Sequence, residues 1–222
     1  MDYQIKRSRR KTMVLTVLPD GCVEIRVPLK TPAELIDRFI CSKQDWIAEK
    51  QALSLQRLSQ RDAVLAKPVH QLRLLGTYWP VDSRINQPLS FDGRTFLLPP
   101  GTLQELQPDI ILLYKQLAKD YILPRVQELS LHTALTPTSV RITSAAGSWG
   151  SCSGKNALSF SWRLILAPPQ AIHYVILHEL CHIREHNHSP AFWALVTHFM
   201  PNWRTARDSL KPLAEELRLE GW

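Results

Sequence analysis

Residues 178–193 read HELCHIREHNHSPAFW and contain the motif His178-Glu179-x-x-His182. Two histidines four residues apart lie on one face of a helix, one turn apart, so both imidazoles can bind one metal ion. The glutamate beside them can act as a general base on a water molecule at that ion. Residues 171–177 (AIHYVIL) lead into the motif with apolar, helical periodicity. They predict a helix that packs into a core and turns its histidines toward a cleft.

A third metal ligand has to come from elsewhere, because a catalytic zinc ion takes three protein ligands and keeps one position open. The residues after the motif offer Glu185, His186 and His188. His186 continues the helical face in line with His182, and a third in-line ligand on a straight helix reaches poorly around one ion. We favour His188, which can fold back to the metal if Asn187 ends the helix in a left-handed conformation. His186 and a distant carboxylate remain the alternatives.

A purely structural interpretation of the motif would require two core histidines with a buried carboxylate between them. A buried charge has to be paired, and a zinc ion supplies that partner. A structural zinc site usually closes with a fourth protein ligand and has no use for a general base. The pattern therefore predicts a Zn²⁺ site with His178 and His182 as ligands, with His188 as the favoured third ligand and with Glu179 as the catalytic base. Cys181 points about 100° away from the histidine face and is interpreted as a packing residue.

The composition sets wide bounds on the fold and on the partners. The chain has 222 residues, 45% of them hydrophobic, which suffices for one large domain or two small ones. Lysine and arginine number 27 against 20 acidic residues, which gives a net charge of +7. A basic solvated surface is the simpler interpretation of this charge, and weak nucleic-acid association is the alternative.

The cysteines and the apolar runs indicate the compartment that we expect. The four cysteines are scattered and form no CxxC pair, which is typical of reduced thiols in a cytoplasmic protein. No apolar run reaches the roughly 18 residues that cross a bilayer. The first residues, MDYQIKRSRRK, contain no apolar stretch of signal-peptide type. We therefore expect a cytoplasmic protein without a membrane partner.

Residues 1–100 are expected to form a β-rich N-terminal subdomain with one long helix. Residues 12–18 and 22–27 have strand character and flank the turn signal Pro19-Asp20-Gly21, which predicts a hairpin. The basic run at residues 6–11 suits a solvated strand edge, with nucleic-acid contact as the alternative.

A helix is predicted from residue 31 to about residue 59. Thr31 can cap it, Pro32 suits its first position, and Glu34 has capping-box spacing. Short apolar segments then return and are expected to add strands to the same N-terminal sheet: residues 71–75, 78–81, 89–91 and 95–98.

Residues 101–222 are expected to form the second, mostly helical domain, with the boundary at Pro99-Pro100-Gly101. A helix is predicted from about residue 103 to 130, which Pro124 can kink or interrupt. Short strands are predicted at 140–143 and 158–166, and Pro168-Pro169 opens the helix of the motif. Two further helices are predicted at residues 190–199 and 204–219.

The sequence resembles the YgjP-like metallopeptidase family over nearly its whole length. Residues 178–193 match the HELxH and NHSxxFW patterns of that family, which is related to the SprT and WLM zinc proteases. The segment at residues 149–152 resembles its WGSC pattern, and residues 162–168 resemble the strand that precedes its active-site helix. Ser148 departs from the family, which usually has Arg before the WGSC tryptophan, and this departure bears on substrate specificity.

The resemblance implies an α+β protein with an N-terminal β-rich subdomain followed by a helical, zincin-like catalytic domain. It implies that His188 is the third zinc ligand and that the substrate is a peptide or a protein. Two other functions remain open: a metal-dependent phosphohydrolase acting on nucleotides, and a DNA-associated protease or nucleic-acid-binding module. The strand predicted at residues 158–166 offers an edge on which an extended peptide can add as a further strand.

Overall fold

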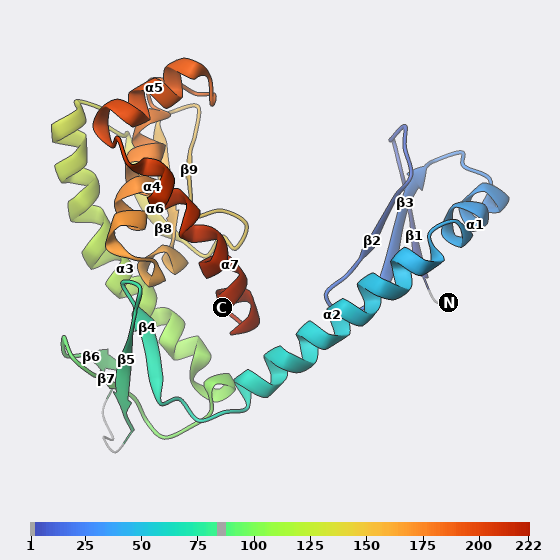
Figure 1. Cartoon of the computed structure of the whole chain (residues 1–222), viewed down its shortest axis with the longest axis horizontal. Coiled ribbons are helices and arrows are strands. Elements are labelled where there is room, and N and C mark those ends of the chain that lie inside the picture. Colours follow the sequence, from blue (N-terminus) through green and yellow to red (C-terminus); the bar gives the residue numbers. More distant parts are fainter. Residues whose placement is uncertain (1–2, 84–87) are drawn as a thin grey trace. The chain divides into compact units, whose positions relative to one another are not determined.

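The computed structural model describes residues 3–83 and 88–222 and has a mixed α+β fold, as the sequence predicted (Figure 1). The chain divides into two compact units, Met1–Leu65 and Ala66–Glu220, and Trp222 belongs to the second unit. This division differs from the boundary expected near residue 100. No helix of the described residues has the length and the apolar character needed to span a membrane.

The first unit is a three-stranded sheet with two helices. The central strand β3 (Val23–Pro28) pairs in parallel with β1 (Tyr3–Ser8) and antiparallel with β2 (Val14–Val17). The predicted hairpin is therefore confirmed as β2 and β3. The buried core joins the inner side chains of β3 to those of the helices: Val23, Ile25, Val27, Ile36, Ile40 and Ile47.

The predicted long helix is two helices, α1 (Ala33–Cys41) and α2 (Gln44–Leu65). The expected cap was wrong, because Pro32 is the N-cap residue and no side chain accepts a hydrogen bond there. Thr31 instead donates its backbone N–H to the carbonyl of Pro28.

The basic run begins on the edge strand β1, and its first two members bind other parts of the first unit. Lys6 forms an ion pair with Glu24, whose side chain is buried in the neighbouring strand. Arg7 donates from Nη1 to the carbonyl oxygens of Leu29, at 3.1 Å, and of Thr31, at 2.8 Å. Lys6 therefore links β1 to β3, and Arg7 links β1 to the segment that follows β3.

The second unit begins with a small sheet in the order β4-β5-β7-β6. Its strands are β4 (Gln71–Leu74), β5 (Thr77–Asp82), β6 (Ser90–Phe91) and β7 (Phe96–Leu97). All four segments had been predicted as strands, but their assignment to the N-terminal sheet was wrong. The turn between β4 and β5 donates its backbone N–H groups at Leu75 and Gly76 to the carbonyls of Ile165 and Leu166. These bonds join the small sheet to the segment that precedes the motif helix.

The long helix α3 (Leu103–Thr133) begins with a capping box between Thr102 and Glu105. It continues through Pro124 as one helix, without the interruption that the sequence allowed. The ring of Tyr114, at its centre, stacks on Trp162 with centroids 5.7 Å apart. The helix thus contributes a central part of the core of the second unit.

A second sheet of this unit has the order β8-β10-β9. The strands are β8 (Ser139–Thr143), β9 (Gly150–Cys152) and β10 (Ala157–Ser161), and β9 was not foreseen from the sequence. The predicted strand at 158–166 ends at Ser161, because residues Trp162–Leu166 form a 3-10 helix.

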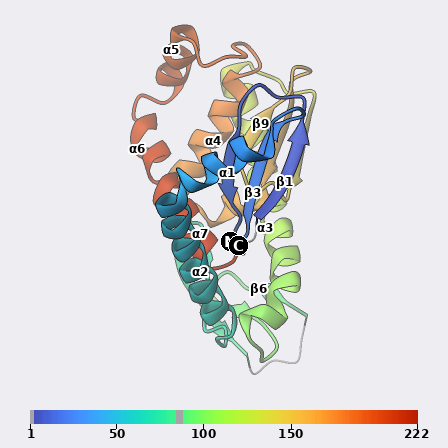
Figure 2. The ribbon, with the colours of Figure 1, turned by 90° about the vertical axis from the view of Figure 1, so that its right-hand side faces the viewer.

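Four helices complete the second unit: α4 (Pro169–Cys181), α5 (Pro190–Phe199), α6 (Trp203–Asp208) and α7 (Leu210–Leu219). Helix α4 contacts α3, α5, α6 and β9. In the view of Figure 2, α5 and α6 lie on one side of α4 and β9 lies on the other. The motif helix is therefore enclosed by structure on several sides.

Candidate metal centre

Helix α4 packs through apolar residues of the run before the motif and through Leu180 inside the motif. Ile172, Val175, Ile176 and Leu180 are at most 4% exposed. Burial of such side chains stabilises a protein by about 1.5–3 kcal/mol each, so the helix has little freedom to shift. It ends at Cys181, and His182 is its C-cap residue.

The segment between α4 and α5 brings His188 back to the helix. Asn187 accepts the backbone N–H of Ser189 on its Oδ1 atom, at 3.1 Å, and Ser189 caps α5 by accepting the N–H of Phe192. The left-handed conformation predicted for Asn187 was wrong, because its φ is not positive. A side-chain hydrogen bond of Asn187 forms the turn instead.

The imidazoles of His178, His182 and His188 form one cluster, with one ring nitrogen of each lying within 4.8 Å of the others. The Nε2 atoms of His178 and His188 are 3.1 Å apart. Tetrahedral bonds of about 2.0–2.1 Å to a zinc ion place ligand atoms about 3.3 Å from one another. The separation of the His178 and His188 nitrogens is therefore close to that of two ligands in a tetrahedral site.

Hydrogen bonds orient two of the three rings. Nδ1 of His182 lies 2.9 Å from the carbonyl oxygen of Glu185. A carbonyl oxygen can only accept, so Nδ1 carries the proton and Nε2 keeps its lone pair for a metal. Nδ1 of His178 lies 3.3 Å from the hydroxyl of Tyr174. Such partners fix the orientation of metal-binding histidines.

Aromatic rings support the cluster from the side of α5. His182 stacks on Phe192 with centroids 4.4 Å apart, and His188 stacks on Trp193 at 5.5 Å. Trp193 in turn stacks on Trp203 at 4.4 Å. The Phe-Trp pair of the NHSxxFW pattern therefore restrains the rings of the two later histidines.

Burial also favours the metal-binding form of His178. It lowers the pKa of this histidine to about 3, and the neighbouring His182 and His188 contribute to the shift. A histidine binds a metal through a neutral imidazole. The ring of His178 is therefore in the required state at neutral pH.

Glu179 lies beside the cluster and is 6% exposed. Burial raises the pKa of its carboxyl to about 7, because the charged form loses hydration. Strand β9 passes so close that a Cβ atom on Gly150 would lie 2.8 Å from Cγ and 2.9 Å from Oε1 of Glu179. Glycine at position 150 thus leaves room for this carboxylate.

Comparison with protein families gives one match, to the YgjP-like metallopeptidase domain, over residues 11–212. The chain belongs to this family. Its membership assigns it to the metallopeptidase-type hydrolases, which use a divalent metal, and the histidine cluster is a group that can hold one. Comparison with curated proteins and with solved structures gave no match.

The structure brings together the four residues that the sequence singled out in this YgjP-like chain. Glu185 contributes its backbone carbonyl rather than its carboxylate, and His186 is exposed and lies outside the cluster. Cys181 is fully buried, as its interpretation as a packing residue required. Tyr174 was missed, although its position one helical turn before His178 was the available signal.

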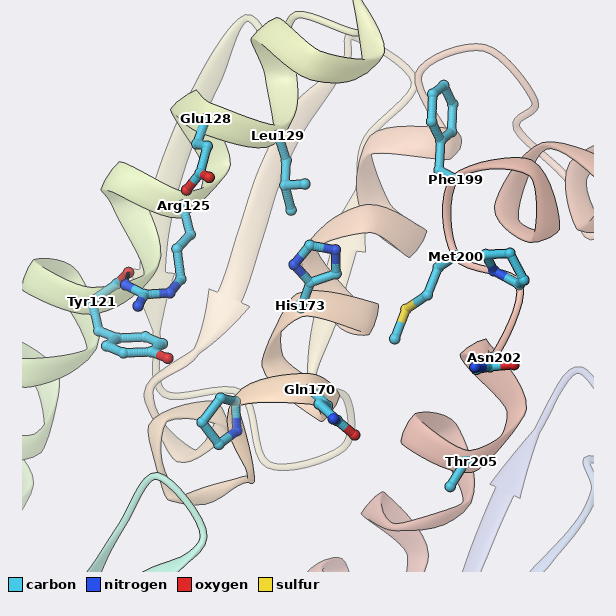
Figure 3. Close-up of a pocket in the computed structure, with 12 residues that line it drawn as sticks. Tyr121, Arg125, Glu128, Leu129, Gln170, His173, Phe199, Met200, Asn202 and Thr205 are labelled. Atoms are coloured by element: carbon cyan, nitrogen blue, oxygen red, sulfur yellow. Dashed lines mark hydrogen bonds between the residues drawn. The ribbon is translucent and has the colours of Figure 1, made fainter.

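Among the described residues of the YgjP-like domain, a cleft and a larger cavity border the motif helix. A cleft of about 410 Å³ is lined by His178 and Glu179. A larger cavity, of about 710 Å³, is lined by His173, and Figure 3 shows side chains of α3, of α4 and of the α5–α6 segment around it. His173 lies five residues before His178 and points about 140° away around the helix. The smaller cleft is therefore the one that belongs to the candidate metal centre.

Proposed function

We propose that this protein is a zinc-dependent peptidase with a zincin-like catalytic domain. The observation that carries the proposal is the buried carboxylate of Glu179 beside a cluster of three imidazoles. Three nitrogen ligands with an open fourth position are the arrangement of a catalytic zinc site. His178, His182 and His188 hold the metal in this proposal, and Glu179 is the catalytic residue.

A zinc ion would be held by the three histidines, and when bound it would supply Lewis-acid polarisation of the scissile carbonyl and would acidify a water molecule. Glu179 takes a proton from the attacking water and delivers it to the nitrogen of the departing amine. Burial raises the pKa of its carboxyl, and this favours uptake of the proton from water. Tyr174 and the Glu185 carbonyl keep the rings of His178 and His182 oriented during these transfers.

Strand β9 is the proposed docking edge for the substrate backbone. The sequence pointed to residues 158–166, but β10 lies in the middle of its sheet and β9 lies at an edge. An extended peptide can add to such an edge through main-chain hydrogen bonds. Gly150 of β9 abuts Glu179, so a peptide on this edge has its carbonyl groups near the proposed base.

Removal of the metal tests the proposal as a whole. We expect the zinc-loaded protein to cleave unstructured peptides, to lose this activity in a chelator, and to regain it when zinc is restored. A panel of peptides and of nucleotide phosphate esters, analysed by mass spectrometry, separates the peptidase from the phosphohydrolase. Hydrolysis of the esters alone, or peptide cleavage that persists without metal, contradicts the proposal.

Gly150→Ala should impair the chemistry while the fold is kept. The new methyl group would lie under 3.0 Å from the Glu179 side chain, so the carboxylate has to move. A displacement of about 1 Å at a catalytic group can lower the rate about 100-fold, and overpacking costs about 1–3 kcal/mol of stability. Peptide cleavage rates and denaturant unfolding measure the two effects.

Gly147→Ala is the matched control, because a Cβ atom there meets nothing within 4 Å. Equal activity of the two variants would show that the contact between Gly150 and Glu179 has no bearing on the reaction.

A further inference from the structure

The cleft beside Glu179 has a composition that points to one class of substrate. It lies between α4, the segment of α6 and α7, and the loop before β9. Its walls carry apolar surface from Trp149, Tyr174, Val175, Leu210 and Ala214. Two cations, Arg207 and Lys211, also line it, and Glu179 is the only carboxylate among its described lining residues.

Arg207 and Lys211 differ in whether their charge is already paired within the protein. Arg207 binds Asp208, from Nε at 3.0 Å and from Nη2 at 2.8 Å to Oδ1, and its guanidinium lies over the ring of Trp203. Lys211 is exposed and has no hydrogen-bond or ion-pair partner among residues 3–83 and 88–222. Its ammonium group therefore remains available to a ligand in the cleft.

We propose that this cleft binds a carboxylate of the peptide substrate through Lys211, and that Lys211 makes the enzyme selective for acidic substrates. The inference rests on the proposed peptidase function. A carboxylate is the complementary group because the cleft offers an unpaired cation, whereas the charge of Arg207 is offset by Asp208. The apolar walls accommodate the methylene groups of an acidic side chain or the last residue of a peptide. Ser148, which also lines the cleft, adds no charge.

The carboxylate has two possible sources, an Asp or Glu side chain near the scissile bond or the free C-terminus of the peptide. Two sets of short peptides distinguish them: pairs that differ only in Glu or Gln at one position, scanned along the peptide, and pairs with a free or an amidated C-terminus. We expect the acidic member of one set to have a kcat/KM about fivefold higher, the upper end for an exposed ion pair. The difference should reside mainly in KM and should shrink as salt is added.

Lys211→Ala should remove this preference and Lys211→Glu should reverse it. Lys119→Ala is the matched control, because Lys119 is an exposed lysine of α3 that does not line the cleft, and it should keep the preference. Equal cleavage of acidic and neutral peptides by the wild type, or a preference that survives in Lys211→Glu, would overturn the inference and leave the peptidase proposal standing.

Binding provides a readout that does not depend on turnover. The same peptides are titrated into the zinc-loaded Glu179→Gln variant by calorimetry, with and without Lys211→Ala. We expect the acidic peptides to bind about fivefold tighter only when Lys211 is present. Acidic and neutral peptides that bind equally would refute the carboxylate site, even if the protein cleaves no peptide and the proposed function itself fails.

Discussion

Glu179→Gln is expected to retain the metal and to lose peptide hydrolysis, with kcat lower by roughly 10²–10⁴-fold. The amide has nearly the size of the carboxylate, so it fits in the space that Gly150 leaves. It cannot accept a proton from water or carry one to the leaving amine. The buried amide also avoids the cost of a poorly hydrated charge, so we expect stability to be maintained or increased.

Metal content by mass spectrometry, unfolding by denaturant and cleavage rates are compared for the wild type and this variant. Glu128→Gln, on α3 and outside the cleft, is the control for the loss of one acidic group. Full activity in Glu179→Gln would reject this residue as the base. Loss of both metal and activity would instead assign Glu179 a structural role in the metal site.

His188→Ala is expected to weaken zinc binding by at least about 100-fold. Loss of a residue that merely orients a ligand costs about 10–100-fold in metal affinity, and loss of a ligand should cost more. The wild type should gain thermal stability on addition of zinc, because a ligand of the folded state stabilises it by mass action. The variant should lose most of that gain.

His186→Ala is the matched control, since His186 is a nearby exposed histidine outside the cluster. It should bind zinc as the wild type does. Full zinc occupancy in His188→Ala would show that another residue is the third ligand. Reduced occupancy in His186→Ala alone would identify His186 as that ligand.

Local sequence determined the candidate centre well, because its parts lie within one short segment. The helical spacing of His178 and His182 follows from the geometry of a single turn, and Asn187, Ser189 and Pro190 form the turn that returns His188 to the helix. Only the detail of that turn was mispredicted, since an asparagine can reverse a chain through its side chain as well as through a left-handed backbone.

The sequence also determined most of the elements, from the hairpin of β2 and β3 to the helix α5, because the hydrophobic period and the turn residues are local signals.

Only the tertiary structure decided which strands share a sheet. The segments of β4 to β7 have ordinary strand patterns, and their place in the second unit depends on bonds to Ile165 and Leu166, about ninety positions later in the chain. Such pairings between distant segments leave no mark on local periodicity. The contact of Gly150 with Glu179, the edge position of β9 and the place of Lys211 in the cleft likewise could not be predicted from local sequence. Each depends on which surfaces meet after the chain has folded.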